Sequence, residues 1–112
     1  MKKYLTNDDK GDQIMTINKN VNGAITTVEI IGRLDTTTAP ELEAALDKCV
    51  TDTQELVLDF HGLEYVSSAG LRVLLKAQKS MPRQDMMKLV GVNESIMEVF
   101  EITGFSDILT IE

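Results

Sequence analysis

The sequence predicts a single α/β domain in which helices pack against a mixed or mostly parallel β-sheet. The chain has 112 residues, which suffices for one domain with its own core. Segments rich in β-branched residues alternate with segments whose apolar residues recur at helical spacing, so the expected order is β-β-α-β-α-β-α-β. Residues 1–12 hold few apolar side chains, and we expect them to form a mobile leader, native or added by cloning, before a domain over residues 13–112.

An opening hairpin is predicted from two short segments that flank an Asn-Gly pair at residues 22–23. In residues 14–20 the side chains at even positions (Ile14, Thr16, Asn18) alternate with those at odd positions (Met15, Ile17, Lys19), as on the two faces of a strand. Residues 24–31 are rich in β-branched side chains. Gly32 is expected to end the second strand, and residues 33–37 are expected to form a loop.

A first helix is predicted after this loop. Thr38 and Glu41 have the spacing of a capping box, and Pro40 is tolerated in the first helical turn. The apolar residues that follow form one stripe: Leu42, Ala45, Leu46 and Cys49. Because Cys49 lies on this stripe, we expect it in the core rather than as a reactive thiol.

The next strand is predicted over residues 55–60, a short apolar run typical of a covered sheet. Residues 61–66 are expected to carry the chain to the second helix. The only histidine, His61, lies here, and no ligand residues stand at metal-binding spacing from it, so we expect a loop or strand-end histidine.

The second helix is predicted to begin at the Ser67-Ser68 pair and to end before Pro82. The basic residues Arg72, Lys76 and Lys79 follow one another at helical spacing, and Arg83 would extend the stripe if the helix continued. This stripe is either an ordinary solvated helix face or a patch that steers a protein partner.

The C-terminal part is predicted to add a strand, a helix and a short edge strand. The strand spans residues 86–92 and the edge strand spans residues 105–111. Asn93 is expected to cap the helix between them, and Gly104 is suited to the left-handed conformation that ends it.

Composition and motifs argue against several classes of function. The net charge of −7 and the absence of Trp disfavour a direct nucleic-acid partner. No glycine-rich phosphate loop is present and no pair of histidine and nucleophile stands out, so the motifs do not support a nucleotide site, and we expect no bound cofactor or metal. Without a long apolar run, a secretory signal or a second cysteine, the chain is expected in the cytoplasm and not inserted in a membrane.

The Ser67-Ser68 pair allows two interpretations. One serine is the N-cap of the second helix, and this alone would explain its presence. Alternatively, a serine at an exposed helix start is a site of phosphorylation. A phosphate there gains from the helix dipole and adds about −1.5 to −2 charges at pH 7, which can abolish association with a partner and leave the fold intact.

Three stretches together resemble the STAS domains, in particular the bacterial anti-sigma factor antagonists. They are FHGLEYVSSAGLRVLL at residues 60–75, GRLD at residues 32–35 with Thr-Ala-Pro shortly after it, and VFEITGFSDI at residues 99–108. The resemblance covers roughly residues 14–111. It implies a four- to five-stranded mixed sheet with helices packed mainly on one side.

The resemblance implies a binding switch rather than an enzyme. In this family the unphosphorylated antagonist binds an anti-sigma factor that is also a serine kinase, and a sigma factor is released. The kinase phosphorylates the antagonist, and a PP2C-type phosphatase removes the phosphate. The alternatives are a STAS subunit of a lipid-transport or other regulatory complex without phosphorylation, or a small nucleotide-binding module, which no loop here supports. The oligomeric state stays open.

The family motif Asp-Ser-[Ser/Thr]-Gly-Leu places the phosphorylated serine at Ser68, with Ser67 as the second choice. Ser67 stands where the family has aspartate, which leaves open whether it competes as the site. Asp35 falls on the family's loop aspartate near the partner surface, or it is a loop or capping carboxylate. The residues expected to bind the partner are Asp35, Thr36, Ser67, Ser68, Ala69, Arg72 and Lys76.

Overall fold

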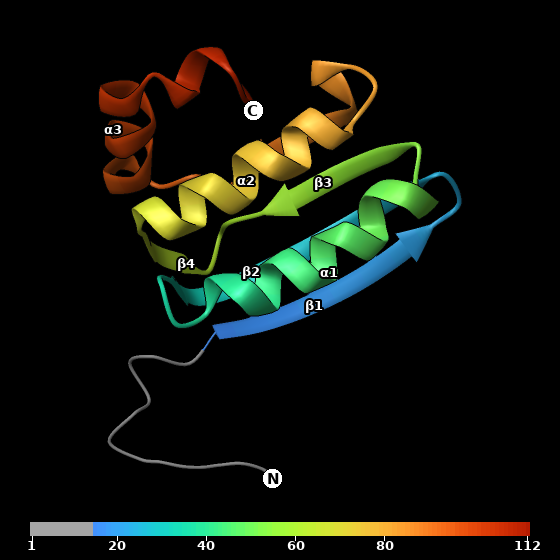
Figure 1. The fold of residues 1–112 in the computed structure, drawn as a ribbon, viewed down its shortest axis with the longest axis horizontal. Coiled ribbons are helices and arrows are strands. Elements are labelled where there is room, and N and C mark those ends of the chain that lie inside the picture. Colours follow the sequence, from blue (N-terminus) through green and yellow to red (C-terminus); the bar gives the residue numbers. More distant parts are fainter. Residues whose placement is uncertain (1–14) are drawn as a thin grey trace, which may run out of the picture.

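The computed structural model describes residues 15–112, in which six strands form one mixed sheet and three helices lie against it (Figure 1). The strand order is β1-β2-β3-β5-β6, and β4 pairs with β2 off this path. Only the first pair, β1 with β2, is antiparallel; the other strand pairs are parallel. The strands are β1 (Met15–Asn22), β2 (Ile25–Leu34), β3 (Glu55–Asp59), β4 (Leu63–Val66), β5 (Met87–Val90) and β6 (Thr110–Ile111).

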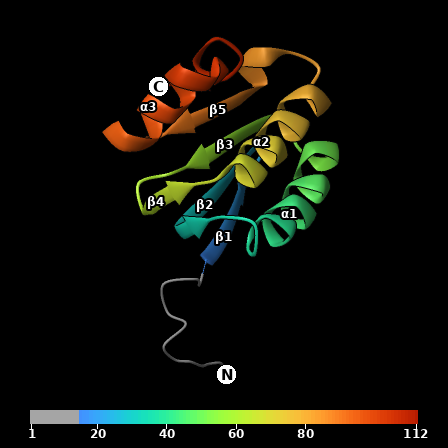
Figure 2. The same ribbon diagram turned by 60° about the vertical axis from the view of Figure 1, so that its left-hand side comes forward.

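The helices are α1 (Ala39–Asp52), α2 (Ser68–Ser80) and α3 (Glu94–Thr103), and they lie mainly on one side of the sheet (Figures 1 and 2). Figure 2 shows α1 and α2 side by side over β1–β3, with α3 nearer β5. The burial pattern of the strands agrees with this arrangement, because the helices lie mainly on one side of the sheet. In β3, Leu56 and Leu58 are fully buried while Val57 and Asp59 on the opposite face are half-exposed. The predicted α/β architecture with a mixed sheet and helices mainly on one side is therefore confirmed, but the sheet of the described residues has six strands where four to five were expected.

Several local predictions are also confirmed. Cys49 is buried in the core, and α2 ends at Ser80, before Pro82. The Asn93 side chain caps α3 by accepting the Ile96 N–H at 2.8 Å, and Gly104 ends the helix with a φ of 84°. Each of these features follows from the conformational or burial preference of a single residue type in its local sequence.

The second strand continues past the residue expected to end it. Gly32 has a φ of 107°, and the register of β2 shifts there, so that the strand bends instead of stopping. Before the bend β2 pairs with β3, and after it β2 pairs with β4. The prediction of a loop from residue 33 was wrong for Arg33 and Leu34, and the prediction of a plain connection over residues 61–66 missed β4.

The last segment also differs from its prediction. Residues 105–111 were expected to form an edge strand, but a 3-10 helix (Phe105–Asp107) comes first and only Thr110–Ile111 pairs with β5. Leu109 follows this turn and is buried in the core. A second 3-10 helix (Gln84–Met86) likewise precedes β5, so that strand is shorter than the predicted 86–92.

The leader predicted over residues 1–12, and the predicted start of the first strand at residue 14, lie outside the described residues. Within residues 15–112, no helix combines the length and the hydrophobicity needed to cross a bilayer.

Candidate functional site

The loop after β2 and the start of α2 lie side by side because β2 and β4 are parallel neighbours. Leu34 and Val66 are register partners at the carboxyl ends of these two strands, and each strand leads directly into a helix. The Ser67 N–H donates to the Leu34 carbonyl at 2.9 Å and fixes the two chain segments together. Residues 35–38 and 67–72 therefore form one edge of the molecule, as in the predicted site.

Gly70 allows α2 to approach this edge closely. A Cβ atom at this position would lie 2.6 Å from Leu34 Cγ and 3.0 Å from Val66 Cγ2. Because both neighbours are buried, neither can move aside cheaply. The glycine of the serine motif therefore has a packing role, and it holds the start of α2 against the end of β2.

The two serines have different roles. Ser67 is the N-cap of α2: its backbone is extended, and its hydroxyl oxygen accepts the Gly70 N–H at 3.4 Å. Ser68 is the first helical residue and is exposed, and its hydroxyl has no hydrogen-bond partner within residues 15–112. The capping interpretation of the pair thus applies to Ser67, and the Ser68 hydroxyl remains available to another molecule.

Asp35 shapes the neighbouring loop. One oxygen of its carboxylate accepts the N–H groups of Thr37 and Thr38 at 3.0 and 3.1 Å, and the other lies 3.9 Å from Arg33 Nε. Its side chain is only 20% exposed. The structure shows the loop and capping interaction for Asp35, while Thr36 between these residues is left exposed.

The capping box predicted for Thr38 and Glu41 was wrong. The Thr38 hydroxyl makes no cap hydrogen bond to α1. It donates instead to the Arg33 carbonyl at 2.8 Å and accepts the Asp35 N–H at 2.9 Å, so it closes the loop back onto β2. Asp35 Oδ1 accepts the N–H groups of Thr37 and Thr38 just before α1, so the turn does not depend on a hydrogen bond between the Thr38 side chain and the helix.

A groove of about 300 Å³ runs between the starts of α1 and α2. Four of the residues expected to bind the partner line it: Thr36, Ala69, Arg72 and Lys76. The opposite wall comes from α1 and includes Ala39, Pro40 and Glu43, which were not predicted as site residues. The packing of α1 beside α2 creates this wall, and the sequence did not indicate it.

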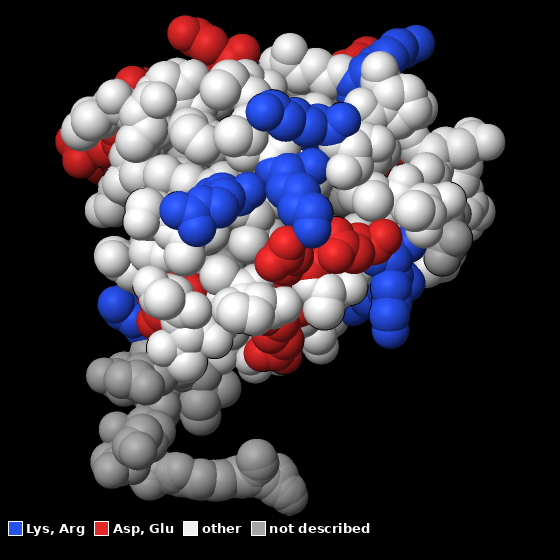
Figure 3. Space-filling model, in the orientation of Figure 1, with Lys and Arg blue, Asp and Glu red and all other residues white. Residues whose placement is uncertain are grey.

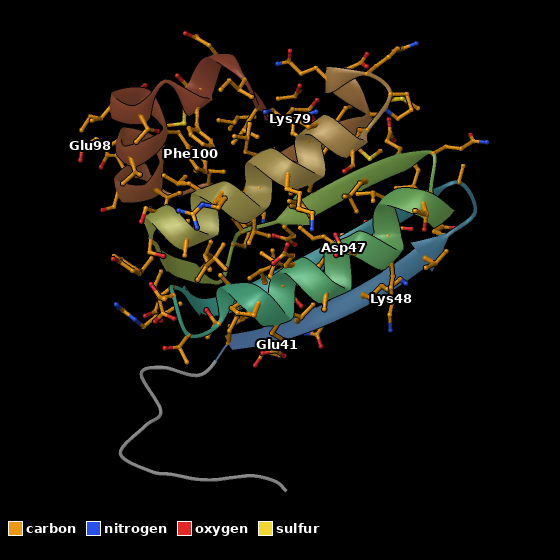
Figure 4. The ribbon with its side chains drawn as sticks, viewed as in Figure 1. Glu41, Asp47, Lys48, Lys79, Glu98 and Phe100 are labelled. Carbon is orange, nitrogen blue, oxygen red and sulfur yellow. The ribbon has the colours of Figure 1, made fainter. Side chains whose placement is uncertain are left out.

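The basic stripe lies on the exposed side of α2 and meets acidic residues of α1. Figure 3 shows basic side chains gathered over α2 with acidic ones directly beside them, and Figure 4 labels Lys79 on α2 and Asp47 on α1. Lys76 Nζ lies 2.7 Å from Glu43 Oε2 and 3.5 Å from Asp47 Oδ1. The hydrogen bond with Glu43 is the main cause that raises the pKa of Lys76.

The other basic residues of α2 differ from Lys76. Arg72 and Lys79 form no ion pair within residues 15–112. Arg83 lies beyond the end of the helix and pairs with Asp85 at 3.0 Å, so it does not extend the stripe. Among the described residues, the cations left unpaired on this face are therefore Arg72 in the second turn of the helix and Lys79 in the last turn.

His61 lies outside this site. Its ring is 72% exposed, and Nδ1 lies 2.6 Å from Asp59 Oδ1 at the end of β3. Burial tends to raise the pKa of Asp59, but the hydrogen bonds from the His61 N–H and ring outweigh it and lower that pKa. Among the described residues, no group of three or more acidic, histidine or cysteine side chains could hold a metal ion.

Comparison with known proteins assigns the family. The family model of the STAS domain matches residues 16–112, and the chain belongs to this family. It is 36% identical over 85 residues to the anti-sigma-B factor antagonist of Listeria monocytogenes, which covers 74% of this chain and 75% of that protein.

Two solved structures show the same fold. An anti-sigma factor antagonist from Mycobacterium paratuberculosis superimposes with a TM-score of 0.80 and 23% identity, over 88% of this chain and 85% of that one. The Bacillus cell fate determinant SpoIIAA in its phosphorylated form superimposes with a TM-score of 0.66 and 14% identity, over 87% of this chain and 91% of that one.

Proposed function

We propose that the chain is an anti-sigma factor antagonist whose binding is switched off by phosphorylation of Ser68. The unphosphorylated form binds an anti-sigma factor that is also a serine kinase, and a sigma factor is released. A PP2C-type phosphatase restores the active form. The chain itself is a binding protein, not an enzyme, and acts in the cytoplasm, where bacterial transcription takes place. The name of the Listeria relative and the family resemblance support this role.

The observation that carries the proposal is the division of roles between the two serines. Ser67 uses its hydroxyl to cap α2, whereas Ser68 is exposed with an unoccupied hydroxyl. A kinase can therefore reach the Ser68 oxygen without breaking a hydrogen bond of the fold. In the reaction this oxygen would attack the γ-phosphorus of ATP, ADP would leave, and the hydroxyl proton would pass to a base of the kinase.

Phosphorylation at this place would change the surface without touching the core. The new group adds about −1.5 to −2 charges at pH 7. It would lie next to the groove that Thr36, Ala69, Arg72 and Lys76 line. A partner seated in this groove would then face a new negative charge and a strongly hydrated group, both of which oppose association. The fold would keep its stability because no buried contact is lost.

Ser67 favours a second candidate function. Where the family motif has aspartate, this chain offers an uncharged hydroxyl, so a kinase that requires the carboxylate would not act here. In that case the domain serves as a STAS subunit of a lipid-transport or other regulatory complex, and Ser68 is a contact residue only.

The test is incubation of the full chain with ATP and the anti-sigma kinase of the same bacterium. Intact mass and peptide mapping should show one phosphate, located on Ser68 and absent from Ser68→Ala. Ser67→Ala is the matched control and should still be phosphorylated. A phosphate on Ser67 would move the site by one residue. No phosphate, with a kinase shown to be active on another substrate, would favour the second candidate.

A further inference from the structure

Arg72 lies one helical turn after Ser68 on the exposed side of α2. Side chains four residues apart share a helix face, and their Cβ atoms are about 5–6 Å apart. Long side chains on a helix also lean toward its N-terminus. By this geometry the guanidinium of Arg72 is within reach of the turn that begins with Ser68. No carboxylate of the described residues pairs with it.

The charged groups on the neighbouring elements leave Arg72 free. Glu43 of α1 lines the same groove, but Lys76 holds it at 2.7 Å and also holds Asp47 of α1 at 3.5 Å. On β4, Glu64 is exposed and makes no ion pair within residues 15–112. The residue before Ser68 is Ser67, so no carboxylate competes from the position directly before the proposed phosphate.

We propose that Arg72 is the residue that binds the phosphate on Ser68. This inference rests on the proposed function. A guanidinium donates two parallel hydrogen bonds to a phosphate, which makes it the best-matched side chain for this group. In the unphosphorylated chain Arg72 lines the groove with its charge unpaired. Phosphorylation therefore adds negative charge and at the same time withdraws the positive charge that a partner would meet there.

The experiment titrates the phosphate itself. The full chain is produced with phosphoserine installed at position 68 during synthesis, so that no kinase is needed, and the second pKa of the phosphate is measured by phosphorus NMR at low ionic strength. An ion pair with Arg72 favours the dianion and lowers this pKa. Arg72→Gln should therefore raise it by about 0.2–0.7 pH unit, and Arg72→Lys should restore part of the difference.

Lys79→Gln is the matched control. Lys79 is an unpaired cation of the same helix, but it lies eleven residues from Ser68, and its replacement changes the net charge equally. It should move the phosphate pKa much less than Arg72→Gln does. Equal shifts in the two variants, or no shift in Arg72→Gln, would overturn the inference.

The outcomes for the two proposals are separable. A shift that is specific to Arg72 combined with failure of the kinase to modify Ser68 would reject the proposed function alone. Kinase-dependent phosphorylation of Ser68 without an Arg72-specific shift would reject the role of Arg72 alone. Arg72 is exposed and makes no ion pair within the described part of the chain, so its variants are expected to fold.

Discussion

At the scale of single residues, Gly70 decides how closely α2 can lie against the sheet. The space for a Cβ atom at this position is already taken by Leu34 and Val66. Helix propensity alone would favour alanine over glycine here by about 1 kcal/mol. The close contact must outweigh this preference, since the added methyl group has no room in a close-packed interior.

We therefore expect Gly70→Ala to destabilise the domain despite its better helix propensity, by about 1–3 kcal/mol for an overpacked core. Urea unfolding measures this. Gly62→Ala is the matched control: its Cβ would lie 3.0 Å from Ile31 Cγ1, and Ile31 is 37% exposed and can give way. If Gly70→Ala is as stable as the wild type, the helix can shift to make room for the methyl group. The close packing at Gly70 would then not be required for stability.

Asp59 and His61 give the domain a defined response to acid. The pKa of Asp59 in the folded chain is below its ordinary value of 3.8, because the hydrogen bonds from His61 outweigh the effect of burial. The stability that this carboxylate contributes is present above pH 3.8 and is lost as the pH falls through the lower folded pKa. Asp59→Asn should therefore flatten the decline in unfolding free energy below this pH. A decline unchanged from the wild type would exclude Asp59 as its source.

At the scale of elements, the ends of the helices follow the conformational preferences of single residues where no tertiary contact overrides them. The caps Asn93 and Gly104 and the end of α2 before Pro82 were predictable because each depends on one residue type. β4 was not predictable, because its burial pattern lacks the alternation of a strand and its pairing depends on the bend at Gly32. The Thr38 capping box failed for a local reason: the Thr38 hydroxyl accepts the Asp35 N–H and donates to the Arg33 carbonyl within the same loop.

The candidate site was predictable in part. The serine motif, Thr36 and the basic residues of α2 were expected from the sequence, and Thr36, Ala69, Arg72 and Lys76 line one groove. The contribution of α1 was missed, because nothing in a linear pattern shows which face of one helix meets another. The same packing also determines that Lys76 is paired by Glu43 and that Arg72 is not.

This difference between the two cations leads to a prediction about association with the partner. Arg72→Ala should slow association and weaken its dependence on salt, because it removes an unpaired positive charge from the groove. Lys76→Ala should have a smaller effect, since the charge of Lys76 is already compensated by Glu43 and Asp47. Stopped-flow or surface plasmon resonance rates at two salt concentrations measure this. A larger effect for Lys76 would mean that the partner displaces these ion pairs.

At the scale of the whole molecule, the fold separates the core from the proposed phosphorylation site. The buried residues lie between the sheet and the helices, including the fully buried Phe60 and Phe100, whereas Ser68 and Arg72 lie on the surface at one end of α2. Figure 4 shows Phe100 directed from α3 into the molecule and Glu98 directed away from it. Under the proposed function, a charge added at Ser68 would therefore alter the binding surface and leave the core unaltered.

The most direct measurement of this account is the affinity of the full chain for the anti-sigma kinase, determined by calorimetry without ATP for the unphosphorylated and the Ser68-phosphorylated forms. Ser68→Ala serves as the control that cannot be modified, and circular dichroism confirms that all three forms are folded. The account predicts that Ser68→Ala binds like the unphosphorylated chain and that the phosphate weakens binding by at least about tenfold, ~1.4 kcal/mol. Equal affinity of the two forms, with both folded, would contradict it.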